Sequence, residues 1–141
     1  MKISDLMSRK LIAVAPNDTV EVAVQLLRRR GVRHLLVMRK NKLVGILSDR
    51  DIKRAMDPGR TKKKLLGIGG LYFLLEPILV HEIMTRDPVT VGPDLSAREA
   101  ARIMVAERFG ALPVEDKGKT VGIVTETDLL RYFAQSGADI D

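Results

Sequence analysis

The sequence predicts an α+β fold built from two pseudo-symmetric repeats of one unit, each a small three-stranded sheet with flanking helices. Three observations support it. Each half carries apolar runs in the order strand, helix, strand, strand, helix. Each half closes with a similar polar signature, GILSDRD at 45–51 and GIVTETD at 122–128. Residues also recur at a constant offset of 77 positions, as in Met7 and Met84, Pro16 and Pro93, Ala23 and Ala100, Val37 and Val114, and Asp51 and Asp128.

Each half begins with a predicted strand and an amphipathic helix. The short runs 11–14 and 88–91 are rich in apolar and β-branched residues, and a proline follows each, which is typical of a brief strand entering a turn. Apolar and small residues then recur at helical spacing. Asp18 with Glu21, and Ser96 with Glu99, predict capping boxes at the two helix starts.

The second part of each half predicts a hairpin and a terminal helix. Apolar runs at 35–38 and 43–47 flank a polar turn, and the same pattern recurs around 116–119. A short helix is expected after the last Asp of each signature, over 52–56 and 129–134.

These boundaries divide the chain into repeat 1 at 1–57, a linker at 58–79 and repeat 2 at 80–141, which together form one module. Within the linker, a basic run at 58–64 is expected to be solvated. The apolar run 65–75 is expected to form a helix that packs on the sheets or on a second protomer. Its glycines, Gly67 to Gly70, lack the spacing of a phosphate-binding loop.

Composition excludes several function classes. With 141 residues, 45% of them hydrophobic, the chain can bury a core. Cysteine is absent and there are two histidines, which argues against disulfides, thiolate catalysis and a metal site. No signal peptide or membrane span is apparent, so a cytoplasmic protein without membrane partners is expected. No spacing of nucleophile, base and acid suggests an enzyme, and no catalytic residue or catalytic cofactor is predicted.

The repeated motifs resemble a known family. Strand, helix and hairpin, with Leu35-Leu36-Val37 or Leu112-Pro113-Val114 and a closing Gly-Ile-x-Ser/Thr-x-x-Asp, resemble a tandem pair of cystathionine beta-synthase (CBS) domains, or Bateman module. The resemblance covers nearly the whole chain. It implies two repeats packed sheet to sheet, a regulatory role rather than catalysis, and a homodimer. The segment from 71 to 85 is also similar to the acetoin-utilisation type of stand-alone CBS protein.

The chemistry of the closing signature fits a nucleotide. Its Gly permits close approach to the strand, its hydroxyl can bind a phosphate or sugar oxygen, and its final Asp can accept from the two ribose hydroxyls. The following helix N-terminus favours an anion. The alternative is that Ser48, Asp51, Thr125 and Asp128 only cap their helices.

In the family, each ligand lies in a cleft between the repeats, so the resemblance implies two pockets. The first would have Ser48 and Asp51 on phosphate and ribose and Ile46 against the base, with Thr85, Val89, Phe109 and Gly110 supplied by the other half. The second would combine residues of both halves: Ser8, Ile12, Val32, Arg33, Ile123, Thr125 and Asp128.

The two pockets differ in expected charge. Arg33, His34 and Arg50 belong by motif position to the first pocket, and their counterparts in the second are the uncharged Gly110, Ala111 and Thr127. Because guanidinium groups bind phosphate bidentately, the first pocket is expected to take di- or triphosphates. The second is expected to prefer fewer phosphates or to stay empty.

Three functions follow from these features. The favoured one is a regulatory module that senses AMP, ADP, ATP or S-adenosylmethionine and signals through an effector protein or a dimer rearrangement. The second is an interaction scaffold with vestigial pockets. The third is a nucleic-acid binder, suggested by the net charge of +6 and by Arg28–Arg30, Arg39–Lys40 and Lys62–Lys64. It is disfavoured because these runs are short and lack interleaved aromatic residues.

Overall fold

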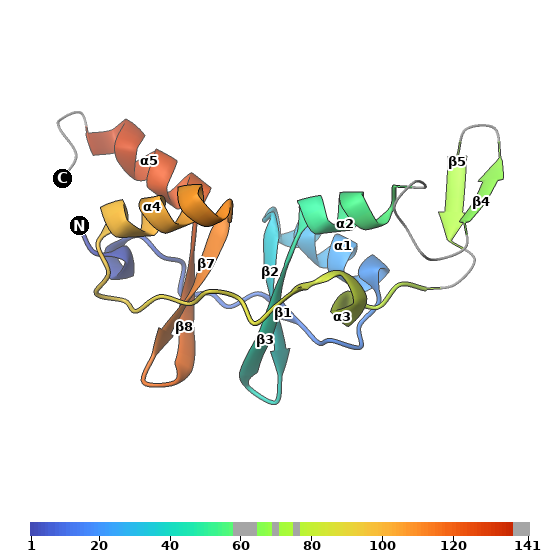
Figure 1. The fold of residues 1–141 in the computed structure, drawn as a ribbon, viewed down its shortest axis with the longest axis horizontal. Helices are drawn as coiled ribbons and strands as arrows, with labels where there is room; N and C mark the ends of the chain where they lie inside the picture. The colour runs from blue at the N-terminus through green and yellow to red at the C-terminus, as the bar shows by residue number, and fades with distance from the viewer. Residues whose placement is uncertain (58–64, 69–70, 75–76, 137–141) are drawn as a thin grey trace. The chain divides into compact units, whose positions relative to one another are not determined.

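A computed structural model describes residues 1–57, 65–68, 71–74 and 77–136, with the backbone alone for 65–74 (Figure 1). The chain forms two compact units. We call Ile12–Asp87 the Ser48 unit, and Met1–Leu11 with Pro88–Asp141 the Thr125 unit. Each unit therefore takes its principal elements from one sequence repeat and a short crossing segment from the other repeat.

The Ser48 unit is a four-stranded sheet with helices. Strand β1 (Ala13–Val14) pairs in parallel with β2 (His34–Arg39), and β2 pairs antiparallel with β3 (Lys42–Ser48). The fourth strand, β6 (Thr85–Arg86), pairs antiparallel with β3. The unit's helices are α1 (Val20–Arg30), α2 (Asp49–Ala55) and α3 (Val80–Ile83). The predicted three strands thus gain a fourth, from beyond the linker.

The Thr125 unit repeats this plan. A 3-10 turn, η1 (Ile3–Asp5), precedes α4 (Ala97–Glu107), the antiparallel pair β7 (Ala111–Asp116) and β8 (Lys119–Thr125), and α5 (Glu126–Ser136). Single bridges replace the two short strands. Val91 pairs in parallel with Val114, and Ser8 pairs antiparallel with Ile123, at the positions that correspond to β1 and β6.

A glycine in each unit admits the crossing segment. A Cβ on Gly45 would lie 2.5 Å from Met84 Sδ and 2.9 Å from the Thr85 carbonyl oxygen. On Gly122 it would lie 2.7 Å from Met7 Sδ and 2.8 Å from the Ser8 carbonyl oxygen. Each signature glycine was expected to permit a close approach, and the group that approaches is a segment of the chain itself.

Each unit has its own core, made of matching residues. In the Ser48 unit, Leu35, Val37 and Leu47 are fully buried. Their counterparts in the Thr125 unit are Leu112, Val114 and Val124, also fully buried. The small residues Ala23 and Ala100 are 0% exposed, so α1 and α4 lie close against their sheets.

One helix start differs from the sequence prediction. The N-cap of α1 is Thr19, whose hydroxyl accepts from the Val22 N–H at 3.4 Å. Asp18 instead accepts from the Ala15 N–H at 2.8 Å and holds the preceding turn. Ser96 caps α4, accepting from the Glu99 N–H at 3.1 Å, but the predicted capping box is not complete, because the Glu99 carboxylate accepts from Arg102 instead.

The prediction of a linker helix is wrong. Leu65–Ile68 forms β4 and Leu71–Leu74 forms β5, which pair antiparallel. Glycine in a helix interior costs about 1 kcal/mol relative to alanine, and the three glycines of this run, with Tyr72 and Phe73, favour strands instead. The basic residues 58–64, and the pair Gly69-Gly70, lie outside the described residues. No helix in the described part of the chain is long and apolar enough to cross a membrane.

Replacing Gly45 by alanine should destabilise the protein by about 1–3 kcal/mol, because the added methyl must displace the Thr85 backbone. Urea denaturation would measure the loss. Gly92→Ala is the matched control, since a Cβ there meets no atom within 4 Å. An equal loss in both variants would contradict the role given to the crossing segment.

Candidate functional site

The Ser48 signature forms a closed hydrogen-bonded turn at the start of α2. The Asp51 N–H donates to Ser48 Oγ at 3.0 Å, and the Ser48 N–H donates to Asp51 Oδ2 at 2.9 Å. These two bonds make a reciprocal capping box, with both side chains half-buried. Ser48 and Asp51 therefore do cap this helix, and whether they also bind a ligand stays a prediction.

Capping leaves part of the signature available for a ligand. Within the described residues, Asp51 Oδ1 has no hydrogen-bond or ion-pair partner, and the Ser48 hydroxyl donates to no acceptor. The pair therefore offers one carboxylate acceptor and one hydroxyl donor, held in place by the capping bonds.

The Thr125 signature is more fully engaged. The Thr125 N–H donates to Asp128 Oδ2 at 2.8 Å, and the Thr125 hydroxyl lies 3.1 Å from the same oxygen, in place to donate to it. The other carboxylate oxygen, Asp128 Oδ1, forms an ion pair with Arg131 Nη1 at 3.7 Å. The groups left open in the Ser48 signature are thus occupied here by the chain itself.

Several predicted site residues gather around the Ser48 signature. His34 lies opposite Ser48 in the β2–β3 register, and Ile46 pairs with Thr85 of β6. The Arg33 carbonyl accepts from the Asp49 N–H at 2.9 Å. Arg50 is exposed on α2. One unit therefore brings together Arg33, His34, Ile46, Ser48, Arg50, Asp51 and Thr85.

The position of Thr85 corrects the sequence interpretation. Thr85 was expected to reach the first pocket from the other half, but it belongs to the same unit as Ile46 and is paired with it. Ser8 likewise shares a unit with Ile123: each N–H donates to the other's carbonyl, at 2.9 and 3.0 Å. Both positions follow from the exchange of crossing segments.

The remaining residues of the first predicted pocket lie in the Thr125 unit. Val89 is exposed there, Phe109 packs against the core of that unit, and the Gly110 carbonyl accepts from the Glu126 N–H at 3.0 Å. Their part in a pocket with Asp51 stays a prediction.

The second predicted pocket is also divided between the units. Ser8, Ile123, Thr125 and Asp128 belong to the Thr125 unit. Ile12, Val32 and Arg33 belong to the Ser48 unit, where Ile12 and Val32 pack against the core. Their joint use by one ligand likewise stays a prediction.

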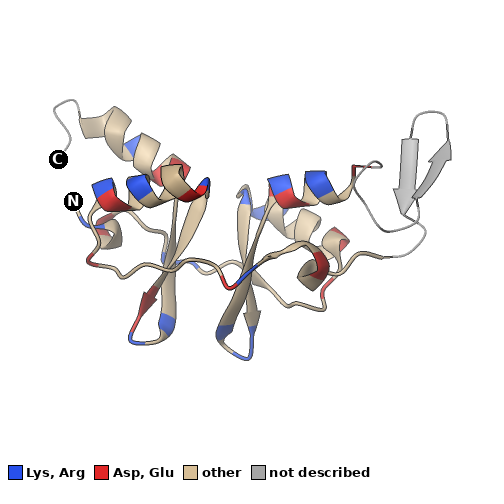
Figure 2. Ribbon diagram, viewed as in Figure 1, with Lys and Arg blue, Asp and Glu red and all other residues tan. Residues whose placement is uncertain are grey.

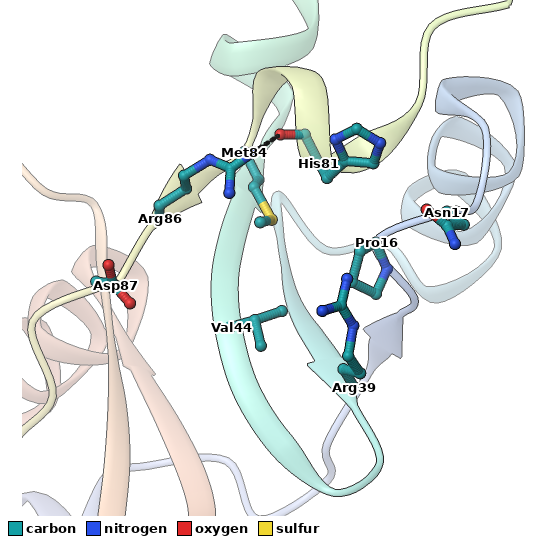
Figure 3. A pocket seen from close by; sticks show the side chains of 8 residues that line it. All are labelled: Pro16, Asn17, Arg39, Val44, His81, Met84, Arg86 and Asp87. Carbon is teal, nitrogen blue, oxygen red and sulfur yellow. Dashed lines mark hydrogen bonds between the residues drawn. The ribbon is translucent and has the colours of Figure 1, made fainter.

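Sequence reasoning missed a surface pocket of the Ser48 unit (Figure 3). Its polar lining includes Arg39, His81 and Arg86, which come from three separate elements. Lys and Arg also gather at the turn between β2 and β3 (Figure 2). A residue-by-residue comparison of the repeats at offset 77 shows that the charge at Arg39 differs from that at Asp116, but it does not bring the pocket's segments together.

Other charged groups do not form a further centre. Arg28–Arg30 make up the exposed last turn of α1, and Lys62–Lys64 lie outside the described residues. Among the residues that the structure describes, no group of three His, Asp or Glu side chains could hold a metal ion.

Comparison with known proteins shows the family. The CBS domain model matches residues 3–58 and 80–135. An inosine-5'-monophosphate dehydrogenase of Korarchaeum cryptofilum is 36% identical over 122 residues, which cover 86% of this chain but 22% of that enzyme. The chain therefore spans only about a fifth of that relative. A CBS domain-containing protein of Dictyostelium discoideum is 32% identical, with 91% and 88% of the two chains covered.

Solved structures confirm the α+β fold and the resemblance. The CBS domain pair of protein MJ0100, in complex with 5'-methylthioadenosine and S-adenosyl-L-methionine, has a TM-score of 0.78 at 27% identity, covering 94% of this chain and 99% of that one. CBSX2 in complex with AMP has a TM-score of 0.73 at 28% identity, covering 97% and 98%. A putative acetoin utilization protein from Vibrio cholerae has a TM-score of 0.75 at 27% identity, covering 95% and 92%.

Replacing Ser48 by alanine should lower the free energy of unfolding by about 1 kcal/mol, because the Asp51 N–H loses its acceptor. Thermal denaturation would measure the change. Thr90→Ala, an exposed hydroxyl outside both signatures, is the control and should have almost no effect. Equal stability of the two variants would mean that the capping box contributes nothing.

Proposed function

The chain belongs to the CBS domain family, and on that premise we propose that it is a regulatory module that binds an adenine nucleotide or a related adenosine compound. In this role it acts by binding and not by catalysis. The candidate ligands are AMP, ADP, ATP and S-adenosylmethionine. Two structural neighbours, with adenosine ligands named in their complexes, support this choice of ligand class.

The proposal rests on the observation that the Ser48 signature has two polar groups available to a ligand. Asp51 Oδ1 is free among the described residues and can accept from a ribose hydroxyl, while the Ser48 hydroxyl can donate to a phosphate or sugar oxygen. Because the capping bonds already fix both side chains, binding would cost little side-chain entropy.

The charges of the Ser48 unit favour a phosphorylated ligand. Arg50 is an exposed cation within the signature, Arg33 is an exposed cation whose carbonyl accepts from the Asp49 N–H, and His34 lies opposite Ser48. Their counterparts Gly110, Ala111 and Thr127 carry no charge, and Asp128 is already paired with Arg131. The Ser48 signature is therefore the proposed phosphate-preferring site. The Thr125 signature would prefer ligands with fewer phosphates or stay empty.

A regulatory module must pass on the effect of ligand binding, and we call that effect its output. A ligand shifts an equilibrium between two states only by binding one of them more tightly, so the output would be a changed assembly or a changed affinity for an effector protein. A homodimer is the proposed assembly. Helix α5 supports it, because it has no buried residue and exposes Leu130 by 66% and Phe133 by 67%.

AMP, ATP or S-adenosylmethionine at about 100 times its dissociation constant should stabilise the protein by about 2.7 kcal/mol, measured as a thermal shift. Asp51→Asn should reduce this shift strongly. The amide oxygen can keep the capping bond to the Ser48 N–H, while the amide nitrogen replaces the acceptor at Oδ1.

Asp49→Asn is the matched control for this experiment, because it makes the same charge change in the first turn of the same helix. It should leave most of the shift intact. No shift with any of the compounds in the folded protein would reject nucleotide sensing and favour the scaffold function. An equal loss in both variants would reject the role of Asp51.

Phe133→Glu should convert the homodimer to a monomer, because a charge on the apolar face of α5 opposes its burial. Analytical ultracentrifugation would measure the mass. Gln135→Glu adds the same charge at another exposed position of α5 and should leave the dimer intact. A wild-type monomer at all concentrations would exclude the proposed assembly.

A further inference from the structure

The pocket of about 330 Å³ in the Ser48 unit is lined by charged and apolar groups from several elements (Figure 3). Arg39 comes from the end of β2, Arg86 from β6, His81 from α3, and Asn17 from the turn after β1. Val44 and Met84 supply apolar surface. The pocket thus combines cationic and amide donors with an apolar wall.

Most of these donors are uncommitted. Within the described residues, the side chains of Arg39, Asn17 and His81 have no hydrogen-bond or ion-pair partner. Arg86 donates one bond, from Nη2 to the His81 carbonyl oxygen at 3.2 Å, which fixes its side chain across α3 (Figure 3). Asp87 also lines the pocket but forms no ion pair with either arginine. The two guanidinium groups are therefore not neutralised by the pocket's own carboxylate.

The second repeat shows which of these residues the fold requires. The residue that corresponds to Arg86 in the other repeat is Arg9. Its Nη2 donates to the Ser4 carbonyl oxygen at 3.4 Å, as Arg86 Nη2 donates to the carbonyl oxygen of His81. The apolar residues are also retained, since Met84 becomes Met7 and Val44 becomes Val121. This framework is common to both units and is explained by folding.

The other polar residues change between the repeats. The corresponding residues of the other repeat are Asp116 for Arg39, Asp94 for Asn17 and Ser4 for His81. Asp94 is moreover paired with Lys2 at 3.3 Å. Because the same backbone plan tolerates acidic residues at two of these positions, folding alone does not demand the donors of the Ser48 unit. These donors make the pocket of the Ser48 unit suited to an anion, whereas the corresponding positions of the Thr125 unit are not.

This pocket is separate from the nucleotide signature. His34 pairs with Ser48 at one end of β2, and Arg39 pairs with Lys42 at the other. Five residues of strand separate the two ends, which at about 3.4 Å per residue is about 17 Å. One small ligand on Asp51 would not span both places.

We infer that the pocket is a second ligand site, which binds a small phosphate-bearing anion through the guanidinium groups of Arg39 and Arg86, with Asn17 and His81 as additional donors. Guanidinium groups match the geometry of phosphate oxygens and bind them bidentately. The apolar wall at Val44 and Met84 would face the organic part of a phosphomonoester.

The test is an NMR titration of the ¹⁵N-labelled full chain at constant ionic strength. Inorganic phosphate, pyrophosphate and glycerol 3-phosphate are the probes. Saturable shifts are expected at the amides of Asn17, Arg39, Val44 and Arg86, and not at 46–51. Tighter binding of glycerol 3-phosphate than of phosphate would identify a phosphomonoester as the ligand class, and the reverse order would identify an inorganic anion.

Arg39→Gln should weaken the tightest probe about tenfold or more, because a charge-assisted hydrogen bond is lost. Lys42→Gln is the matched control: it removes the same charge from the residue opposite Arg39, outside the pocket, and should change the affinity less than about twofold. Asn17→Asp, which introduces the acidic residue of the other repeat, should also weaken binding.

Three results would overturn this inference. The first is the absence of saturable shifts with all three probes. The second is an equal loss in Arg39→Gln and Lys42→Gln, which would indicate unspecific attraction to a basic surface. The third is a set of shifts centred on 46–51 and lost in Asp51→Asn, which would assign phosphate to the nucleotide signature. The proposed nucleotide function would survive all three.

Discussion

The antiparallel pairing of a crossing segment with the second hairpin strand is the constraint on which each unit depends. Thr85 pairs with Ile46, and Ser8 pairs with Ile123, each beside a glycine that leaves no room for a side chain. This contact completes the sheet and seats Met84 or Met7 against the core. It also places a second backbone segment directly beside the strand that ends in the polar signature. The site and the fold therefore share one structural requirement.

The two signatures show how one local motif can be left open or closed. Both use a hydroxyl and a carboxylate to cap a helix, and this accounts for the recurrence of the residue types. The difference lies in the second carboxylate oxygen, which Arg131 contacts in one unit and which is open, among the described residues, in the other. The corresponding Arg54 forms no such pair with Asp51. The Arg131 ion pair, together with the bond from the Thr125 hydroxyl to Asp128, thus distinguishes two otherwise similar turns.

Local patterns predicted local structure well. The hairpins, the order of elements and the cap at Ser96 follow from apolar periodicity and from residue types that act within a few positions. The choice of Thr19 over Asp18 was not predictable, because both residues are good caps and stand side by side. The apolar run at 65–74 has no clear period, which is why a hairpin was mistaken for a helix. The pairing of Thr85 with Ile46 leaves no local signal, since the partners are far apart in the chain. The pocket at Arg39 was missed for the same reason: its donors come from distant segments.

The exchange of crossing segments also sets the order in which the chain can fold during synthesis. The Ser48 unit is one continuous stretch, Ile12–Asp87, so all its strands are synthesised before Pro88 and the residues that follow it. The Thr125 unit joins Met1–Leu11 to Pro88–Asp141, and Ser8 cannot pair until Ile123 has been synthesised. Closing that long loop costs entropy before any contact compensates for it. Met1–Leu11, although synthesised before the Ser48 unit, can therefore reach their final place only after the strands of that unit are complete.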